Sequence, residues 1–254
     1  MRDGGNGGGA ASRTLRVCAL YPDLMNIYAD RGNLLMLERR CVWRGMGFEL
    51  IASGLGERLD PDAGDLFYIG GGQDRDQRLC AEDLIATKRE ALHAAAARDA
   101  VVLGVCGGYQ LLGRSYTLDD ERIPGVGLLD VETVRQEGRL IGNEAIEVRL
   151  AGTDGPRVLA GFENHGGRTR LGEGQQHLGR VLRGHGNDGT SGSEGAVAGN
   201  TIGTYLHGPL LPKNVWFADW LIARALAIEP GELAQLDDAL ERDAHLSARR
   251  AAGI

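Results

Sequence analysis

The stretch that most constrains the fold spans residues 100–113. It reads Ala-Val-Val-Leu-Gly-Val-Cys-Gly-Gly-Tyr-Gln-Leu-Leu-Gly. Its first half is a short apolar run rich in β-branched residues, which is typical of a parallel strand buried on both faces. Two glycines follow Cys106, and residues 109–112 have the character of a helix start. The stretch therefore predicts a buried strand that turns sharply into a helix at a cysteine.

Residues 104–108 form the pattern Gly-x-Cys-x-Gly, which is the thiol version of a nucleophile elbow. A sharp turn strains the backbone of its central residue, so the neighbouring positions need little bulk. The N-terminus of the following helix favours thiolate and can lower a cysteine pKa from ~8.5 to ~3.5–7.5. A small apolar core residue is the alternative for an isolated cysteine. Here the strand, the glycines and the helix start together favour a nucleophile at Cys106.

Composition and length limit the class of protein. A chain of 254 residues is long enough for one α/β domain with a sizeable core. The formal net charge of −7 argues against a nucleic-acid or anionic-membrane surface. The four cysteines are scattered without a Cys-x-x-Cys pair, which indicates a reducing cytoplasm and neither a zinc site nor disulfides. We expect residues 1–13 to be a disordered Gly-rich tail, and no apolar run reaches the ~20 residues of a membrane span.

The order of predicted elements indicates a doubly wound sheet. Strands are expected over residues 15–20, 48–52, 65–69 and 101–105, and helices over 27–45 and 79–98. This β-α-β-β-α-β-α order predicts a three-layer, mainly parallel sheet flanked by helices. Further along, the prediction is shorter and partly antiparallel strands at 144–150 and 157–162, a mobile surface loop at 184–195, a strand at 200–206, and helices at 214–227 and from Pro230 onward.

A glycine triplet, Gly70-Gly71-Gly72, directly follows the third predicted strand. Ligands of open α/β sheets bind beyond the carboxyl ends of the strands, where such a loop offers backbone N–H groups to an anion or a carbonyl oxygen. A flexible turn is the alternative. The triplet is not a phosphate-binding P-loop, because no Gly-Lys-Ser/Thr follows it.

A nucleophilic cysteine needs a base, normally a histidine. Of the six histidines, His165 and His207 each follow a predicted strand and can lie close to Cys106. Spacing does not choose between them, although His207 has the cleaner context of a strand followed by a turn.

Three ordered motifs extend the argument: Val105-Cys-Gly-Gly-Tyr-Gln110, Gly161-Phe-Glu-Asn-His-Gly-Gly-Arg168 and Gly203-Thr-Tyr-Leu-His-Gly-Pro209. Together they resemble class I glutamine amidotransferases of the cobyric-acid-synthase-like (CobB/CobQ) branch. Residues 69–75 and 211–214 are similar to one group within it, the glutaminase subunits of lipid II isoglutaminyl synthase. The resemblance covers residues 15–228, so it implies an amidotransferase domain over 14–228 and a helical extension over 229–254.

The resemblance implies a role for each site residue. Cys106 would attack the side-chain amide of L-glutamine and form a thioester, and His207 would act as general base and then acid. Arg139, in an Arg-Leu-x-Gly loop, would hold the glutamine, since a guanidinium suits an α-carboxylate. His165 would be structural or face a partner. The implied oxyanion-hole donors are the backbone N–H groups of Gly70, Gly71, Gly72 and Gly107.

The sequence departs from the family pattern at the position where a third catalytic residue, an acid that orients the histidine, is expected. Many class I amidotransferases carry an acid two positions after the histidine, where this chain has Pro209. Either Glu163 folds back to orient His207, or a carboxylate arrives from a partner, and we favour the second.

The resemblance also implies the partner and substrates. A MurT-like subunit of the Mur-ligase type would hold ATP and Mg²⁺ in a cytoplasmic heterodimer, while this chain would need neither cofactor nor metal. The acceptor would be lipid II at the inner face of the membrane, for cell-wall synthesis and cell shape. The alternatives are the glutaminase part of a cobyrinate-type synthase, a DJ-1/PfpI-like cysteine hydrolase, and a catalytically silent scaffold.

Overall fold

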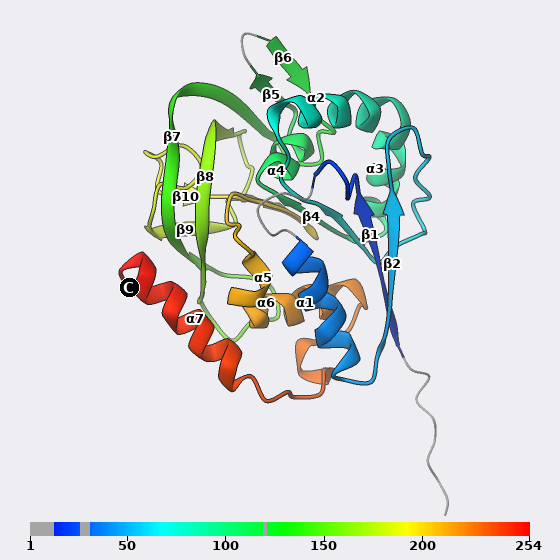
Figure 1. The fold of residues 1–254 in the computed structure, drawn as a ribbon, viewed down its shortest axis with the longest axis vertical. Helices are drawn as coiled ribbons and strands as arrows, with labels where there is room; N and C mark the ends of the chain where they lie inside the picture. Colours follow the sequence, from blue (N-terminus) through cyan, green and yellow to red (C-terminus); the bar gives the residue numbers. More distant parts are fainter. Residues whose placement is uncertain (1–12, 26–30, 119–120) are drawn as a thin grey trace, which may run out of the picture.

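The computed structural model describes residues 13–25, 31–118 and 121–254. Residues 1–12 of the tail predicted at 1–13, and residues 27–30 at the predicted start of the first helix, lie outside the described residues. The core is a six-stranded sheet that is parallel except for one edge strand (Figure 1). In spatial order its strands are β11 (Ala196–Ala198), β12 (Thr201–Thr204), β4 (Val101–Val105), β3 (Leu66–Ile69), β1 (Thr14–Leu20) and β2 (Gly47–Ser53). The predicted doubly wound α/β fold is therefore confirmed.

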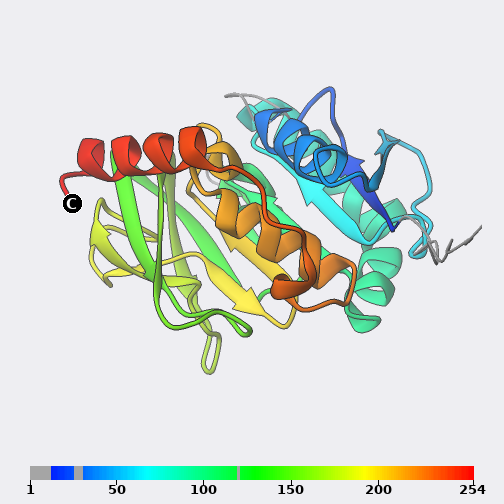
Figure 2. The ribbon, with the colours of Figure 1, turned by 90° about the horizontal axis from the view of Figure 1, so that it is seen from below.

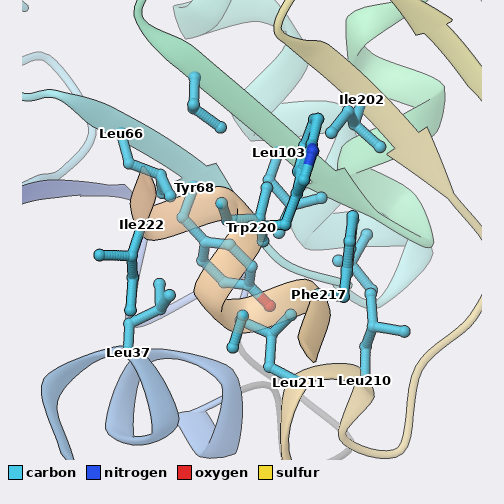
Figure 3. Packing of buried hydrophobic residues seen from close by; sticks show 14 of the residues in the cluster. Leu37, Leu66, Tyr68, Leu103, Ile202, Leu210, Leu211, Phe217, Trp220 and Ile222 are labelled. Carbon is cyan, nitrogen blue, oxygen red and sulfur yellow. The ribbon is translucent and has the colours of Figure 1, made fainter. Parts of the chain in front are cut away.

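Helices cover both faces of this sheet. One face carries α1 (Arg31–Val42), α5 (Leu210–Lys213) and α6 (Val215–Ala225); the other carries α2 (Asp74–Asp83), the π-helical turn η1 (Leu84–Lys88), α3 (Arg89–Ala97) and α4 (Gly107–Leu112). Alternate strand residues feed two separate cores: Leu103 packs with the α6 face, and Val102 packs with the α2–α3 face. Figure 3 shows the first core, where Phe217 and Leu37 meet the sheet. The single helix predicted over residues 79–98 is divided in the structure into three consecutive helical segments, α2, η1 and α3, which together run from Asp74 to Ala97.

A second sheet stands beside the first (Figure 1). It contains β5 (Ser115–Leu118), β6 (Glu121–Pro124), β7 (Val131–Val148), β8 (Arg157–Leu171), β9 (Gly179–Arg183) and β10 (Ser193–Glu194). The strands predicted at residues 144–150 and 157–162 are longer in the structure, where β7 and β8 pair with each other over most of their length. Arg139 therefore lies in β7 and not in a loop, at a register shift between Arg135 and Leu140.

The surface loop predicted at residues 184–195 is a loop apart from β10, but it lies only partly at the surface. Asn187 and Glu194 are fully buried, and both are hydrogen-bonded. The Asn187 side chain donates to the Gly195 carbonyl (3.0 Å), and the Glu194 carboxylate accepts from Thr204 Oγ1 (2.5 Å) and the Tyr205 N–H (2.8 Å). Glycine-rich composition pointed to mobility, whereas polar side chains that satisfy buried backbone groups fix the segment in place.

The C-terminal segment folds back on the domain. A 3₁₀ turn, η2 (Pro230–Glu232), precedes α7 (Ala239–Ala252), so the final helix begins later than the predicted Pro230. Figure 2 shows α7 lying across β7 and β8. The buried guanidinium of Arg40 joins Asp219 of α6 to Asp238, the residue before α7. Among the described residues, no helix is both long and apolar enough to cross a bilayer.

Candidate active site

The turn between β4 and α4 has the geometry of a nucleophile elbow. Cys106 is the N-cap of α4, with φ +54° and ψ −109°, a backbone conformation that is strained for a side chain with a Cβ. Its N–H donates to the Thr204 carbonyl of the neighbouring strand (2.8 Å). A Cβ at Gly108 would lie 2.1 Å from the Ile69 carbonyl oxygen, so only glycine fits there. The sharp strand-to-helix turn predicted from the sequence is present.

Cys106 opens into a cavity of about 240 Å³ between the two sheets. Its lining includes Gly72, Gln73, Asp74, Gln77, Cys106, Gly107, Gln110, Arg135, Arg139, Asn164 and His165. Two of the four glycines predicted to supply oxyanion donors, Gly72 and Gly107, therefore border the same space as the thiol. The carbonyl of Gly70 accepts from the Gly108 N–H (3.0 Å), which ties the glycine loop to the first turn of α4.

His207 lies beside the elbow because its strand is paired with that of Cys106. β12 runs parallel to β4 with Thr204 opposite Val105, so both side chains follow the carboxyl ends of adjacent strands. His207 is 3% exposed, and its backbone exchanges two hydrogen bonds with Phe162 of β8. Burial, together with the positive charges of neighbouring basic groups, lowers the pKa of His207 to about 4, although the Glu163 carboxylate opposes the shift. The imidazole is therefore neutral at neutral pH and able to accept a proton.

The other candidate histidine, His165, lines the cavity and is held rigidly. Its ring stacks on Tyr205 with a centroid separation of 3.6 Å and an interplanar angle of 4°. Its Nδ1 is 2.8 Å from the Gly167 carbonyl oxygen, so this nitrogen carries the proton and donates. The remaining nitrogen, Nε2, is 3.7 Å from a carboxylate oxygen of Glu163. These contacts give His165 a fixed place in the wall of the cavity.

Glu163 is fully buried, and its hydrogen bonds hold the turn at residues 185–186. It accepts from the His185 N–H (2.8 Å), from His185 Nδ1 (2.6 Å) and from the Gly186 N–H (3.1 Å). Burial raises the pKa of Glu163, but the nearby His165 and the hydrogen bonds from His185 outweigh burial and lower it. No sequence pattern singled out His185, which lies in a glycine-rich stretch.

Arg139 reaches the cavity from β7, held by one neighbour on β8. Its Nε donates to Asn164 Oδ1 (2.7 Å), and its Nη2 donates to the Asn164 carbonyl (2.8 Å). This pair of bonds fixes the plane of the guanidinium at the wall of the cavity. The structure thus brings Arg139 to the same space as Cys106.

A chain of hydrogen bonds that the sequence did not predict runs from the wall of the cavity into the second sheet. Gln77 Nε2 donates to Gln110 Oε1 (2.7 Å), and Gln110 Nε2 donates to Tyr205 Oη (3.1 Å). Tyr205 Oη is in turn 2.7 Å from Thr169 Oγ1 of the second sheet. Gln110 belongs to the motif around Cys106, but nothing in the sequence pattern singled out the partners. No grouping of His, Cys, Asp and Glu that could hold a metal ion occurs among the described residues.

The overall fold is shared with solved amidotransferase structures. The chain superposes on PurLQS from Thermotoga maritima with a TM-score of 0.56, 17% identity, and coverage of 93% of this chain and 98% of that one. A glutamine amidotransferase from the same organism gives a TM-score of 0.54, 18% identity, and coverage of 94% of each chain. The fold is that of the class I glutamine amidotransferases.

Sequence comparison identifies the family. Residues 16–215 match the CobB/CobQ-like glutamine amidotransferase domain, and the chain belongs to that family. It is 38% identical over 224 residues to the GatD subunit of lipid II isoglutaminyl synthase (glutamine-hydrolyzing) from Streptococcus pneumoniae, covering 87% of this chain and 84% of that protein. The Staphylococcus aureus GatD subunit is 38% identical over 225 residues, covering 86% and 89%. A probable cobyric acid synthase from Methanothermobacter thermautotrophicus is 38% identical over 176 residues, covering 62% and 33%. The predicted family is confirmed.

Proposed function

We propose that this chain is the glutaminase subunit of a lipid II isoglutaminyl synthase. It hydrolyses L-glutamine to glutamate and ammonia and passes the ammonia to a MurT-like ligase subunit. That partner amidates the α-carboxylate of D-glutamate in the peptidoglycan stem peptide. The observation that carries the proposal is Cys106 at the strained elbow, open to a cavity that also contains Arg139. The likeness to two GatD subunits over more than four-fifths of either chain supports the choice of acceptor.

In the first half of the reaction, neutral His207 accepts the thiol proton of Cys106, and the sulfur attacks the side-chain amide carbon of glutamine. The oxyanion that forms is stabilised by backbone N–H groups, with those of Gly107 and Gly72 bordering the cavity. The His207 imidazolium then returns its proton to the amide nitrogen as the C–N bond breaks. Ammonia leaves, and a γ-glutamyl thioester remains on Cys106.

Water completes the cycle. His207 takes a proton from water, whose oxygen attacks the thioester carbon. As the C–S bond breaks, the His207 imidazolium returns that proton to the sulfur, which releases glutamate and regenerates the Cys106 thiol. Arg139 holds the substrate through its α-carboxylate, for which a planar guanidinium already fixed by Asn164 is preorganised.

The third catalytic carboxylate comes from the partner in this proposal. Pro209 stands where an acid would follow His207 in sequence, and the hydrogen bonds of Glu163 hold the turn at residues 185–186. A carboxylate supplied across the interface would orient His207 only in the assembled complex. This would couple glutamine hydrolysis to assembly and limit wasteful release of ammonia.

Carboxylate amidation requires activation, which we assign to ATP and Mg²⁺ on the ligase subunit. The acceptor carries a lipid, so we place the complex in the cytoplasm at the inner face of the membrane. A cobyrinate-type acceptor is the second candidate, supported by the likeness to cobyric acid synthases. The chain covers only 33% of the length of that relative, which makes this acceptor the weaker choice.

The test is glutamate release from L-glutamine by the purified chain, alone and with its ligase partner, with Cys106→Ala as the blank. We expect Cys106-dependent release that rises sharply when the partner is added. Equal rates with and without the partner would refute the carboxylate supplied in trans. Absence of Cys106-dependent release under both conditions would refute the glutaminase itself.

A further inference from the structure

Two oppositely charged side chains, one next to each sheet, line the cavity. Asp74 begins α2, directly after the glycine loop of the first sheet, and Arg135 lies on β7 of the second sheet. Arg135 Nη1 is 3.1 Å from Asp74 Oδ2, and both residues line the cavity that contains Cys106. Their side chains are 48% and 62% exposed, so both are accessible from solvent as well as from the cavity.

The pair contributes little to the stability of the fold. Exposed ion pairs typically contribute little to stability, because water already solvates both partners. The same exposure makes Asp74 available, since a ligand cation can replace Arg135 without leaving a buried charge unpaired. The charges are therefore better placed for recognition than for stability.

The charged groups of the cavity match one kind of head group. Among the lining residues that the structure describes, Asp74 is the only carboxylate, and Arg135 and Arg139 are the only guanidinium groups. An α-amino acid carries an ammonium and a carboxylate on the same carbon. One acid flanked by two arginines is complementary to that zwitterion, whereas Arg139 alone recognises only the carboxylate.

We propose that Asp74 binds the α-ammonium of the substrate and so makes the site specific for a free α-amino acid. This inference rests on the glutaminase function proposed above. In the free protein Arg135 neutralises Asp74. When substrate enters, its ammonium takes the place of Arg135 on Asp74, and Arg135 joins Arg139 beside the α-carboxylate. Asp74 is thus a specificity-determining residue for the reaction at Cys106.

The experiment compares L-glutamine with glutaramate, which keeps the side-chain amide and the carboxylate but lacks the α-amino group. Hydrolysis of both is measured with the full chain and its ligase partner, for the wild type, Asp74→Asn and Asp76→Asn. Asp76 is the matched control, because it lies in the same helical turn and loses the same charge but does not line the cavity.

We expect Asp74→Asn to lower kcat/KM for L-glutamine on the order of 10- to 100-fold, mainly through KM, since a hydrogen bond to a charged group is lost. The kcat/KM for glutaramate stays unchanged, and Asp76→Asn changes neither value. Asp74→Glu, which keeps the charge, restores part of the preference for L-glutamine. Equal losses for both substrates, or no loss for L-glutamine, would overturn the inference.

A second readout does not depend on turnover. Substrate protection of Cys106 against alkylation by iodoacetamide gives the apparent Kd of each compound. L-glutamine should protect the wild type at lower concentration than glutaramate, and Asp74→Asn should abolish that difference. If Cys106 is protected but no glutamate is released, the proposed function fails and the binding role of Asp74 stands. If glutamate is released and both variants discriminate like the wild type, only the role of Asp74 fails.

Discussion

The buried base His207 should leave a measurable trace on the pH dependence of folding stability. Its pKa is about 4 in the folded chain against an ordinary value of 6.5. Each pKa unit corresponds to 1.36 kcal/mol, so the difference is worth ~3 kcal/mol. The folded state holds His207 neutral, whereas the unfolded chain takes up the proton below pH 6.5. The free energy of unfolding therefore carries no penalty from His207 above pH 6.5 and falls as the pH drops from 6.5 towards 4.

The assay is the free energy of unfolding in urea, measured in steps from pH 7.5 to pH 4 for the wild type and for His207→Gln. Other groups titrate in both proteins, so the difference between the two curves isolates His207. We expect the wild type to lose ~3 kcal/mol relative to the variant between pH 6.5 and 4. His177→Gln, which removes an exposed histidine, is the control. Parallel curves for the wild type and His207→Gln would refute the reasoning that burial keeps the base neutral.

Three further changes test other parts of the site. Gly108→Ala should destabilise the fold by ~1–3 kcal/mol, because its Cβ would lie 2.1 Å from the Ile69 carbonyl oxygen. Gly231→Ala is the control, since a Cβ there meets nothing within 4 Å, and equal melting temperatures for the two variants would contradict this prediction. Arg139→Lys should raise KM for L-glutamine ~10-fold with kcat retained, since lysine lacks the planar fork; an unchanged KM would remove Arg139 from substrate binding. Glu163→Gln should lower stability by ~1–3 kcal/mol but keep kcat in the complex; a kcat loss on the order of 100-fold would make Glu163 the third catalytic residue.

The first half of the fold could be predicted because its signals are local. Buried parallel strands such as β4 are continuous apolar runs, and the glycines around Cys106 mark a sharp turn where side chains would not fit. Parallel strands present their carboxyl ends at one edge, so Cys106 and His207 were both expected there, but spacing did not choose between His165 and His207, and only the structure shows that β12 pairs with β4.

The second sheet could not be predicted with the same success. β7 contains a run of polar and charged residues around Arg139 that gives no clean alternation, and its length depends on pairing with a distant segment, β8. The burial of Glu194 and the contact of His185 with Glu163 are likewise set by tertiary packing. Composition alone assigned that segment to a mobile loop. The charge pair of Asp74 and Arg135 joins residues 61 positions apart, so sequence spacing carried no trace of it.

We propose that Cys106 releases ammonia for a ligase on another subunit. Amidation of lipid II by the complex of this chain with its MurT-like partner, supplied with either L-glutamine or ammonium, tests this role. With Cys106→Ala, we expect the glutamine-dependent rate to fall at least on the order of 10³-fold while the ammonium-dependent rate is retained. Glutamine-dependent amidation that survives Cys106→Ala would refute the role of Cys106.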